Sequence, residues 1–106
     1  MANRITIYQG NTVNIRTTIT DQDGSVVNLT NLTVSLTIYN GTTEVLQIDN
    51  TTHTTPASGI TTFEITKVQT AAFPATLLTY EVEVTYQDGA KFTGTRDKIE
   101  VIGDLA

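Results

Sequence analysis

Alternation of apolar and polar residues, with a period of two, runs through most of this chain and constrains its fold more than any other feature. It is clearest in "NLTVSLTIYN" (31–40) and "TLLTYEVEVTYQ" (76–87). Such alternation predicts strands with one buried and one solvated face. The core positions expected from these two segments are Leu32, Val34, Leu36, Ile38, Leu78, Tyr80, Val82, Val84 and Tyr86.

Shorter strand-like segments fill most of the remaining sequence: "RITIY", "TVNIRTTIT", "TEVLQI", "ITTFEI", "AKFTGTR" and "KIEVIG". Threonine, valine and isoleucine suit a pleated surface, and helix-forming residues are scarce. About seven or eight short strands with turn residues between them are typical of an immunoglobulin-like antiparallel β-sandwich. The 106 residues are enough for one such domain, so we expect a single all-β domain spanning residues 1–106.

One segment departs from the strand pattern. In "TKVQTAAFP" (66–74), Thr66 is suited to cap a helix, and Val68 and Ala72 would then lie on the same side. Pro74 ends any helix that forms there. We therefore predict one short helical turn near residues 66–73, crossing from one sheet to the other.

The segment Asp21-Gln22-Asp23-Gly24 raises the question of a metal site. A calcium loop needs at least about six oxygen ligands, yet the next acidic residue after Asp23 is Glu44. The same Gln-Asp-Gly order recurs at 87–89, where it predicts a hairpin. We therefore interpret Asp21–Gly24 as a turn that binds no metal. Asn40-Gly41 predicts another hairpin, whose two central residues should tolerate positive φ.

No catalytic constellation is apparent. His53 is the only histidine and is expected to be an exposed loop residue of "DNTTHTTPASG" (49–59). Glu81 and Glu83 alternate on one strand face, which is typical of a solvated surface rather than of an acid–base pair. There is no cysteine, and a net charge of −5 disfavours nucleic-acid binding. We expect no enzyme, no cofactor and no metal.

The N-terminal sequence has no apolar run of the kind found in signal peptides, and no segment is long enough for a membrane span. These features favour synthesis in a cytoplasm and give no reason to expect a membrane partner.

The order of the motifs resembles the immunoglobulin-like domains of tailed-phage virion proteins, notably the N-terminal domain of baseplate upper proteins. The resemblance covers about residues 5–101. Its elements are a glycine-bearing turn, an Asp-x-Asp-Gly turn, a "VNLT" step, the strand "LTVSLTIYN" and the region "GITTFEITKVQTAAFPATLLTYEVEVTYQDGAKFT". It implies a structural virion protein made in the host bacterial cytoplasm. The implied partners are the major capsid protein or a tail or baseplate protein, and the implied state is a homo-oligomer such as a trimer.

Baseplate upper proteins carry further domains after this module, whereas the present sequence ends at "IEVIGDLA". A capsid decoration (cement) protein or a small tail-attached subunit is therefore an equal expectation. The expected contact segments are the N-terminal arm, the loop 49–59 and the C-terminal tail, of which the arm and the loop should order on docking. Their candidate residues are Met1, Ala2, Asn3, Arg4, His53, Gly103 and Asp104.

The alternative is a carbohydrate-binding or host-surface-adhesion module. Sugar platforms need exposed aromatic side chains, tryptophan is absent, and only Tyr8 and Tyr39 lie at strand ends where they would serve.

Overall fold

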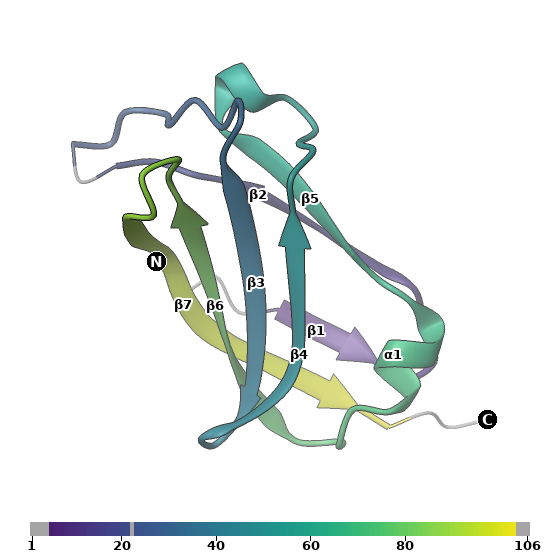
Figure 1. Cartoon of the computed structure of the whole chain (residues 1–106). Coiled ribbons are helices and arrows are strands. Elements are labelled where there is room, and N and C mark those ends of the chain that lie inside the picture. The colour runs from purple at the N-terminus through teal and green to yellow at the C-terminus, as the bar shows by residue number, and fades with distance from the viewer. Residues whose placement is uncertain (1–4, 22, 104–106) are drawn as a thin grey trace.

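Seven strands and two short helical segments make up the described part of the chain (Figure 1). The computed structural model describes residues 5–21 and 23–103, with only the backbone at Gly94 and Thr95. The elements are β1 (Ile5–Tyr8), β2 (Val13–Thr18), β3 (Thr33–Asn40), β4 (Thr43–Asn50), η1 (Pro56–Ser58), β5 (Ile60–Ile65), α1 (Lys67–Ala71), β6 (Leu77–Thr85) and β7 (Lys91–Ile102).

The strands form two sheets that pack face to face. The larger sheet has five strands in the order β1-β7-β6-β3-β4, and the smaller consists of β2 and β5. The pair β1–β7 is parallel, whereas the other pairs are antiparallel. The predicted all-β sandwich is therefore confirmed. The segments 90–96 and 98–103, which the sequence presents separately, belong almost entirely to the one continuous strand β7.

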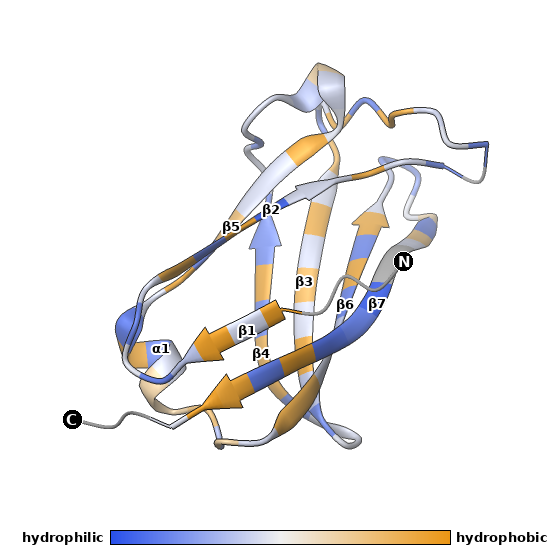
Figure 2. Ribbon diagram, turned by 180° about the vertical axis from the view of Figure 1, so that it is seen from behind, coloured by the Kyte–Doolittle hydropathy of each residue, from blue (hydrophilic) through white to orange (hydrophobic). Residues whose placement is uncertain are grey.

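The core lies between the sheets and consists of the inward-facing residues of both. Figure 2 shows this division as orange bands that alternate with pale bands along β3 and with blue bands along β6. Most of the side chains predicted for the interior are buried, with at most 3% exposure at Leu36, Ile38, Tyr80, Val82 and Val84, and Phe63 of β5 is buried with them at 0%. Leu32 and Tyr86 are partly buried against this core. Burial, and secondly the charge of Asp97, raise the pKa of Tyr80.

The predicted helical turn is α1, and it does connect the two sheets, since it lies between β5 and β6. Thr66 caps it as expected: its hydroxyl accepts from the Gln69 N–H at 3.2 Å, and the Gln69 side chain accepts from the Thr66 N–H at 2.8 Å. The side that packs inward carries Thr70 and Phe73, whereas Val68 is 73% exposed.

No helix among residues 5–21 and 23–103 has the length and apolar character needed to cross a membrane.

The hairpin predicted at Asn40-Gly41 forms, but its two central residues are Gly41 and Thr42, because Asn40 pairs with Thr43. Gly41 has φ 64°, and Asn40 is not among the residues with positive φ. Positive φ is thus needed only at the glycine, which is the pattern of a hairpin with glycine at the first central position. The prediction that both Asn40 and Gly41 occupy central positions was wrong by one residue.

His53 is buried, with 9% exposure, so the expectation of an exposed loop histidine is wrong. Its Nε2 lies 2.8 Å from the Leu32 carbonyl oxygen, which can only accept, so Nε2 carries a proton and donates. In the neutral ring, Nδ1 then accepts from the Thr61 hydroxyl at 3.0 Å, and that hydroxyl accepts from the Asn50 side-chain amide at 3.0 Å. The loop thus folds back onto β5 through a satisfied polar chain.

We expect Thr61→Val to lower the free energy of unfolding by about 1–3 kcal/mol, because this nearly isosteric change leaves the buried His53 Nδ1 without its donor. Urea denaturation followed by circular dichroism measures the effect. Thr62→Val is the control, since within the described part of the chain the Thr62 hydroxyl has one hydrogen-bond partner, the exposed Thr54 hydroxyl, at 2.6 Å. Equal losses for the two variants would contradict a role for the His53 chain.

Candidate docking surface

The contact residues expected from the sequence do not come together. Met1, Ala2, Asn3, Arg4 and Asp104 lie outside the described residues. Gly103 is half-buried just after β7, while His53 is hydrogen-bonded inside the loop between β4 and β5. The end of β7 and the loop between β4 and β5 lie at opposite ends of the sandwich (Figure 1).

The outer face of the five-stranded sheet is polar, and its charged side chains are ordered by cross-strand contacts. Arg96 donates to the Glu81 carboxylate from Nε at 3.0 Å and from Nη2 at 2.5 Å. Lys91 lies 3.8 Å from the Glu83 carboxylate. Glu81 and Glu83 thus lie on the outer face, as predicted, each beside a cation. Exposed ion pairs of this kind contribute little stability, so their main effect is on side-chain orientation.

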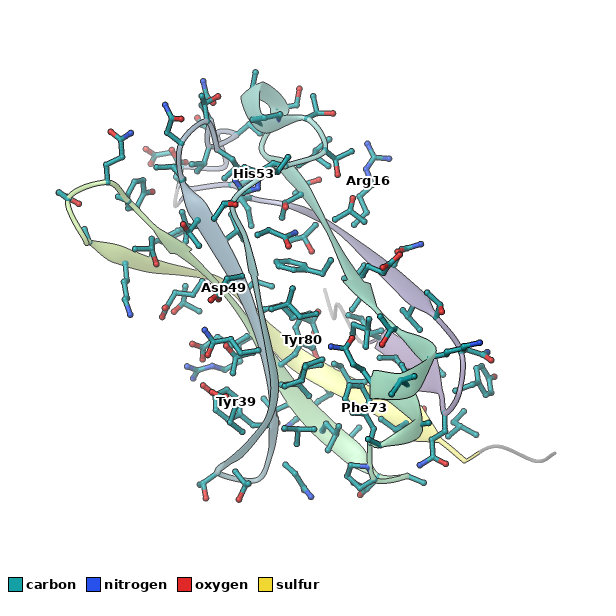
Figure 3. All side chains as sticks on the ribbon, turned by 45° about the vertical axis from the view of Figure 1, so that its right-hand side comes forward. Arg16, Tyr39, Asp49, His53, Phe73 and Tyr80 are labelled. Carbon is teal, nitrogen blue, oxygen red and sulfur yellow. The ribbon has the colours of Figure 1, made fainter. Side chains whose placement is uncertain are left out.

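Asp49 on the edge strand β4 is held in a similar way, and Figure 3 shows it on the outer side of the sheet. Its Oδ1 accepts from the Ser35 hydroxyl at 2.7 Å and from the Gln47 amide at 2.9 Å. The Gln47 and Ser35 hydrogen bonds lower the pKa of Asp49. On this face, acids lie along β4 and β6, while β7 carries Lys91, Arg96 and Lys98 together with Glu100.

A line of apolar side chains crosses one end of this outer face. We call it the outer diagonal and define it as Tyr39, Leu77, Ile102 and Tyr8. From β3 to β6, Tyr39 pairs with Thr79, which is two residues from Leu77. From β6 to β7, Leu77 pairs with Glu100, which is two residues from Ile102. From β7 to β1, Ile102 pairs directly with Tyr8. Diagonal neighbours of this kind lie within reach of aromatic and long side chains.

The outer diagonal is partly open to solvent, with Tyr39 and Ile102 partly buried, and has a polar rim. Tyr8 is 52% and Leu77 is 48% exposed, whereas the core residues of the same strands are buried. Lys98 borders it and donates from Nζ to the Thr79 hydroxyl at 3.1 Å. Tyrosine is enriched at protein interfaces, where one ring gives both apolar area and a hydroxyl group.

Sequence reasoning found the two tyrosines but missed Leu77 and Ile102. The signal for Leu77 was present, because it has the same parity as Thr79 and Glu81 in "LLTYEVEV" and is therefore an apolar residue at a solvent position. The pairing of β1 with β7, which brings Tyr8 beside Ile102, depends on residues about ninety positions apart and has no local signature.

Asp21, Asp23 and Gly24 belong to a turn, as predicted, while Gln22 lies outside the described residues. The Asp21 carboxylate accepts from the Asp23 and Ser25 N–H groups, each at 3.0 Å, and Gly24 has φ 83°. Among the described residues, no group of three or more His, Cys, Asp or Glu side chains could hold a metal ion. The absence of metal binding stays a prediction.

No protein-family model and no curated protein sequence matches the chain. Among solved structures, it is similar to the immunoglobulin-like domain of mouse leukocyte-associated immunoglobulin-like receptor 1, crystallised as a strand-swapped dimer. The TM-score is 0.52 with 14% sequence identity, over 93% of this chain and 88% of that chain. At a sequence identity this low, the similarity supports a conclusion about the fold alone. The predicted immunoglobulin-like fold is confirmed.

Proposed function

We propose that the chain is a non-enzymatic docking module of a tailed-phage virion, which attaches through its outer diagonal to a repeated protein surface. The observation that carries the proposal is the apolar line Tyr39–Leu77–Ile102–Tyr8 within an otherwise polar sheet face, in which Tyr8 and Leu77 are about half exposed and the other two are partly buried. Apolar side chains ringed by polar ones are the usual composition of a protein-binding patch. The partner is the major capsid protein or a tail or baseplate protein.

The virion assignment is supported by the sequence resemblance to immunoglobulin-like domains of tailed-phage proteins. The resembling motifs have defined structural roles in this chain: the Asp21–Gly24 turn, strand β3 and the hairpin at Asp88-Gly89. These are turn and core residues, so each motif by itself specifies only the fold. The order of the motifs along the chain, which resembles that in the tailed-phage domains, is what suggests a virion protein.

A repeated lattice suits a module of this size. The outer diagonal is small, so one contact would bind weakly, whereas several linked copies bind with much higher avidity. A trimer or ring on the particle, as a capsid decoration or a tail-attached subunit, would supply those copies.

The test is incorporation into particles. We expect the double substitution Tyr8→Ser and Leu77→Ser to reduce the amount of protein in purified virions about tenfold or more, because it removes two interface anchors. The melting temperature should change little, since both side chains are about half exposed. Quantitative mass spectrometry of virions measures incorporation, and differential scanning calorimetry measures stability.

Val68→Ser is the matched control, because Val68 is apolar and 73% exposed but lies on α1, outside the outer diagonal. Wild-type incorporation of the double variant, or an equal loss for the control, would contradict docking through this surface. Absence of the wild-type protein from virions would contradict the virion assignment itself.

The alternative is glycan binding at a host surface. The observation that favours it is that Tyr8 and Tyr39 lie on the same outer face, where aromatic rings are available for stacking. Tight glycan binding by the isolated domain, lost in Tyr39→Ser and Tyr8→Ser but kept in Val68→Ser, would replace the virion proposal with this one.

A further inference from the structure

The two sheets have four edge strands, namely β1 and β4 in the larger sheet and β2 and β5 in the smaller. Unpaired strand edges expose backbone N–H and C=O groups and invite another strand, so proteins usually shorten, charge, bend or cover them. The four edges of this chain differ in whether they carry such protection.

Three of the edges are protected. β1 has only four residues. β4 carries Glu44 and Asp49, and its pairing with β3 is interrupted by an irregularity at Ile38/Tyr39. The edge of β5 that faces away from β2 is covered: Ile60 exchanges two backbone hydrogen bonds with Thr55, each of 3.1 Å, and the Asn50 amide donates to the Thr62 carbonyl at 2.8 Å.

The remaining edge, that of β2, is open. β2 is six residues long, has no glycine or proline, and pairs with β5 in an uninterrupted register. The backbone groups of Ile60 and Thr62 point away from β2, so these residues do not hydrogen-bond to their partners Thr18 and Arg16. The backbone groups of Thr18 and Arg16 therefore point to the free edge. Asn14 has the same parity along β2, so its backbone groups point there too. Within residues 5–21 and 23–103, no backbone hydrogen bond covers these groups.

The side chains of β2 are also incompletely covered. Val13, Ile15 and Thr17 face the core but are only half-buried, whereas their partners Ile65, Phe63 and Thr61 on β5 are fully buried. A further strand beside β2 would therefore bury apolar surface as well as pair three residues of backbone.

We propose that this strand is β2 of a second copy, paired antiparallel across a two-fold axis to give a continuous sheet β5-β2-β2-β5. The two copies would face each other with identical patches, as a two-fold interface requires. This inference does not depend on the virion assignment and would hold for the chain in any setting.

The backbone determines which registers are possible. Asn14, Arg16 and Thr18 must lie opposite even-numbered residues of the partner strand, because residues of this parity present their hydrogen-bonding groups at the edge. That parity keeps the apolar face of both strands on the core side, whereas a one-residue shift would turn it outward.

Charge then selects among the allowed registers. With Ile15 opposite its own copy, Arg16 lies opposite Asn14, whose neighbour on β5 is Glu64. The guanidinium of each copy thus approaches a carboxylate of the other. Moving the pairing by two residues in one direction places Arg16 opposite its own copy, which is repulsive. In this register the strand is therefore self-complementary in charge.

The absence of cysteine from the chain makes this register directly testable. Ile15→Cys places two sulfhydryls on strands whose paired Cα atoms lie about 4.5 Å apart, within disulfide range. Asn14→Cys is the control, because its own copy would be two positions away, at about 8 Å. We expect mild oxidation to cross-link the full chain carrying Ile15→Cys to a dimer, and to leave Asn14→Cys monomeric in non-reducing electrophoresis.

A second measurement needs no cross-link. Sedimentation velocity of the full chain should move from monomer toward dimer as concentration rises, and Arg16→Glu should raise the dimer dissociation constant about tenfold, because symmetry repeats the altered contact twice. Lys98→Glu makes the same charge change on the other sheet and should leave the constant unchanged. Melting curves establish that each variant is folded.

Several results would overturn the proposal. A wild-type chain that stays monomeric at all concentrations, together with Ile15→Cys that does not cross-link, rules out pairing. Cross-linking of Asn14→Cys as fast as that of Ile15→Cys would indicate random collision. An equal change of the dimer dissociation constant in Arg16→Glu and Lys98→Glu would indicate that the copies associate through another surface.

Discussion

Replacement of Gly59 by alanine is expected to lower the free energy of unfolding by about 3–5 kcal/mol, a large share of the stability of a domain this size. Gly59 is buried just before β5 and has φ 72°. A Cβ atom there would lie 2.6 Å from Val26 Cγ1, 2.8 Å from the Ile19 oxygen and 2.9 Å from the Val27 oxygen. The two oxygens belong to the backbone and cannot rotate away, so the segments must separate.

Gly41→Ala separates the two causes of this loss, which are the strain of a side chain at positive φ and the close contacts of the added Cβ atom. Gly41 also has positive φ, 64°, but a Cβ there would meet nothing within 4 Å. It should therefore cost only the strain of the left-handed backbone, about 1–2 kcal/mol. Urea denaturation of both variants gives the comparison. Equal costs would mean that the close approach of residues 19, 26 and 27 to Gly59 is unimportant.

Leu36→Ala should lower the free energy of unfolding by about 3 kcal/mol, because it leaves a cavity in a close-packed interior. Leu36 has 0% exposure and lies on the central strand β3, between Ile48 of β4 and Val82 of β6. For a domain of about 100 residues this corresponds to a fall of roughly 12–24 °C in melting temperature. Calorimetry and urea denaturation measure the two quantities.

Thr37→Ala is the control on the same strand. Thr37 faces outward between Gln47 and Glu81, and its loss should cost under about 1 kcal/mol. A cost for Leu36→Ala below about 0.5 kcal/mol, the range of surface changes, would contradict the assignment of the two faces of β3.

The elements and faces of the sandwich were predictable because they depend on local pattern. The period-two segments became β3 and β6, and Thr66 capped α1, since side-chain alternation and capping are local properties of the backbone. The position of His53 was not predictable in this way. Its burial depends on Leu32 and Thr61, which lie in other segments and reach it only in the folded chain.

The candidate docking surface likewise has one part that local sequence pattern predicts and another that depends on contacts between distant segments. Tyr8 and Tyr39 were recognisable as aromatics at strand ends, but the outer diagonal exists only because β1 pairs with β7 and β6 lies between β7 and β3. Likewise, nothing in "VNIRTT" distinguishes an edge strand from a central one. Strand order is decided by long-range packing, which sequence periodicity does not encode.

The parallel pairing of β1 with β7 has a mechanical consequence. The chain enters β1 at Ile5 and leaves β7 at Ile102, and the four paired positions between Ile5↔Ile99 and Tyr8↔Ile102 align the strands in the same direction. Tension applied at those two points pulls the strands past each other along their length. The load then falls on all four pairs together, in shear. The β3–β4 hairpin, pulled at its open end, would instead open one pair at a time.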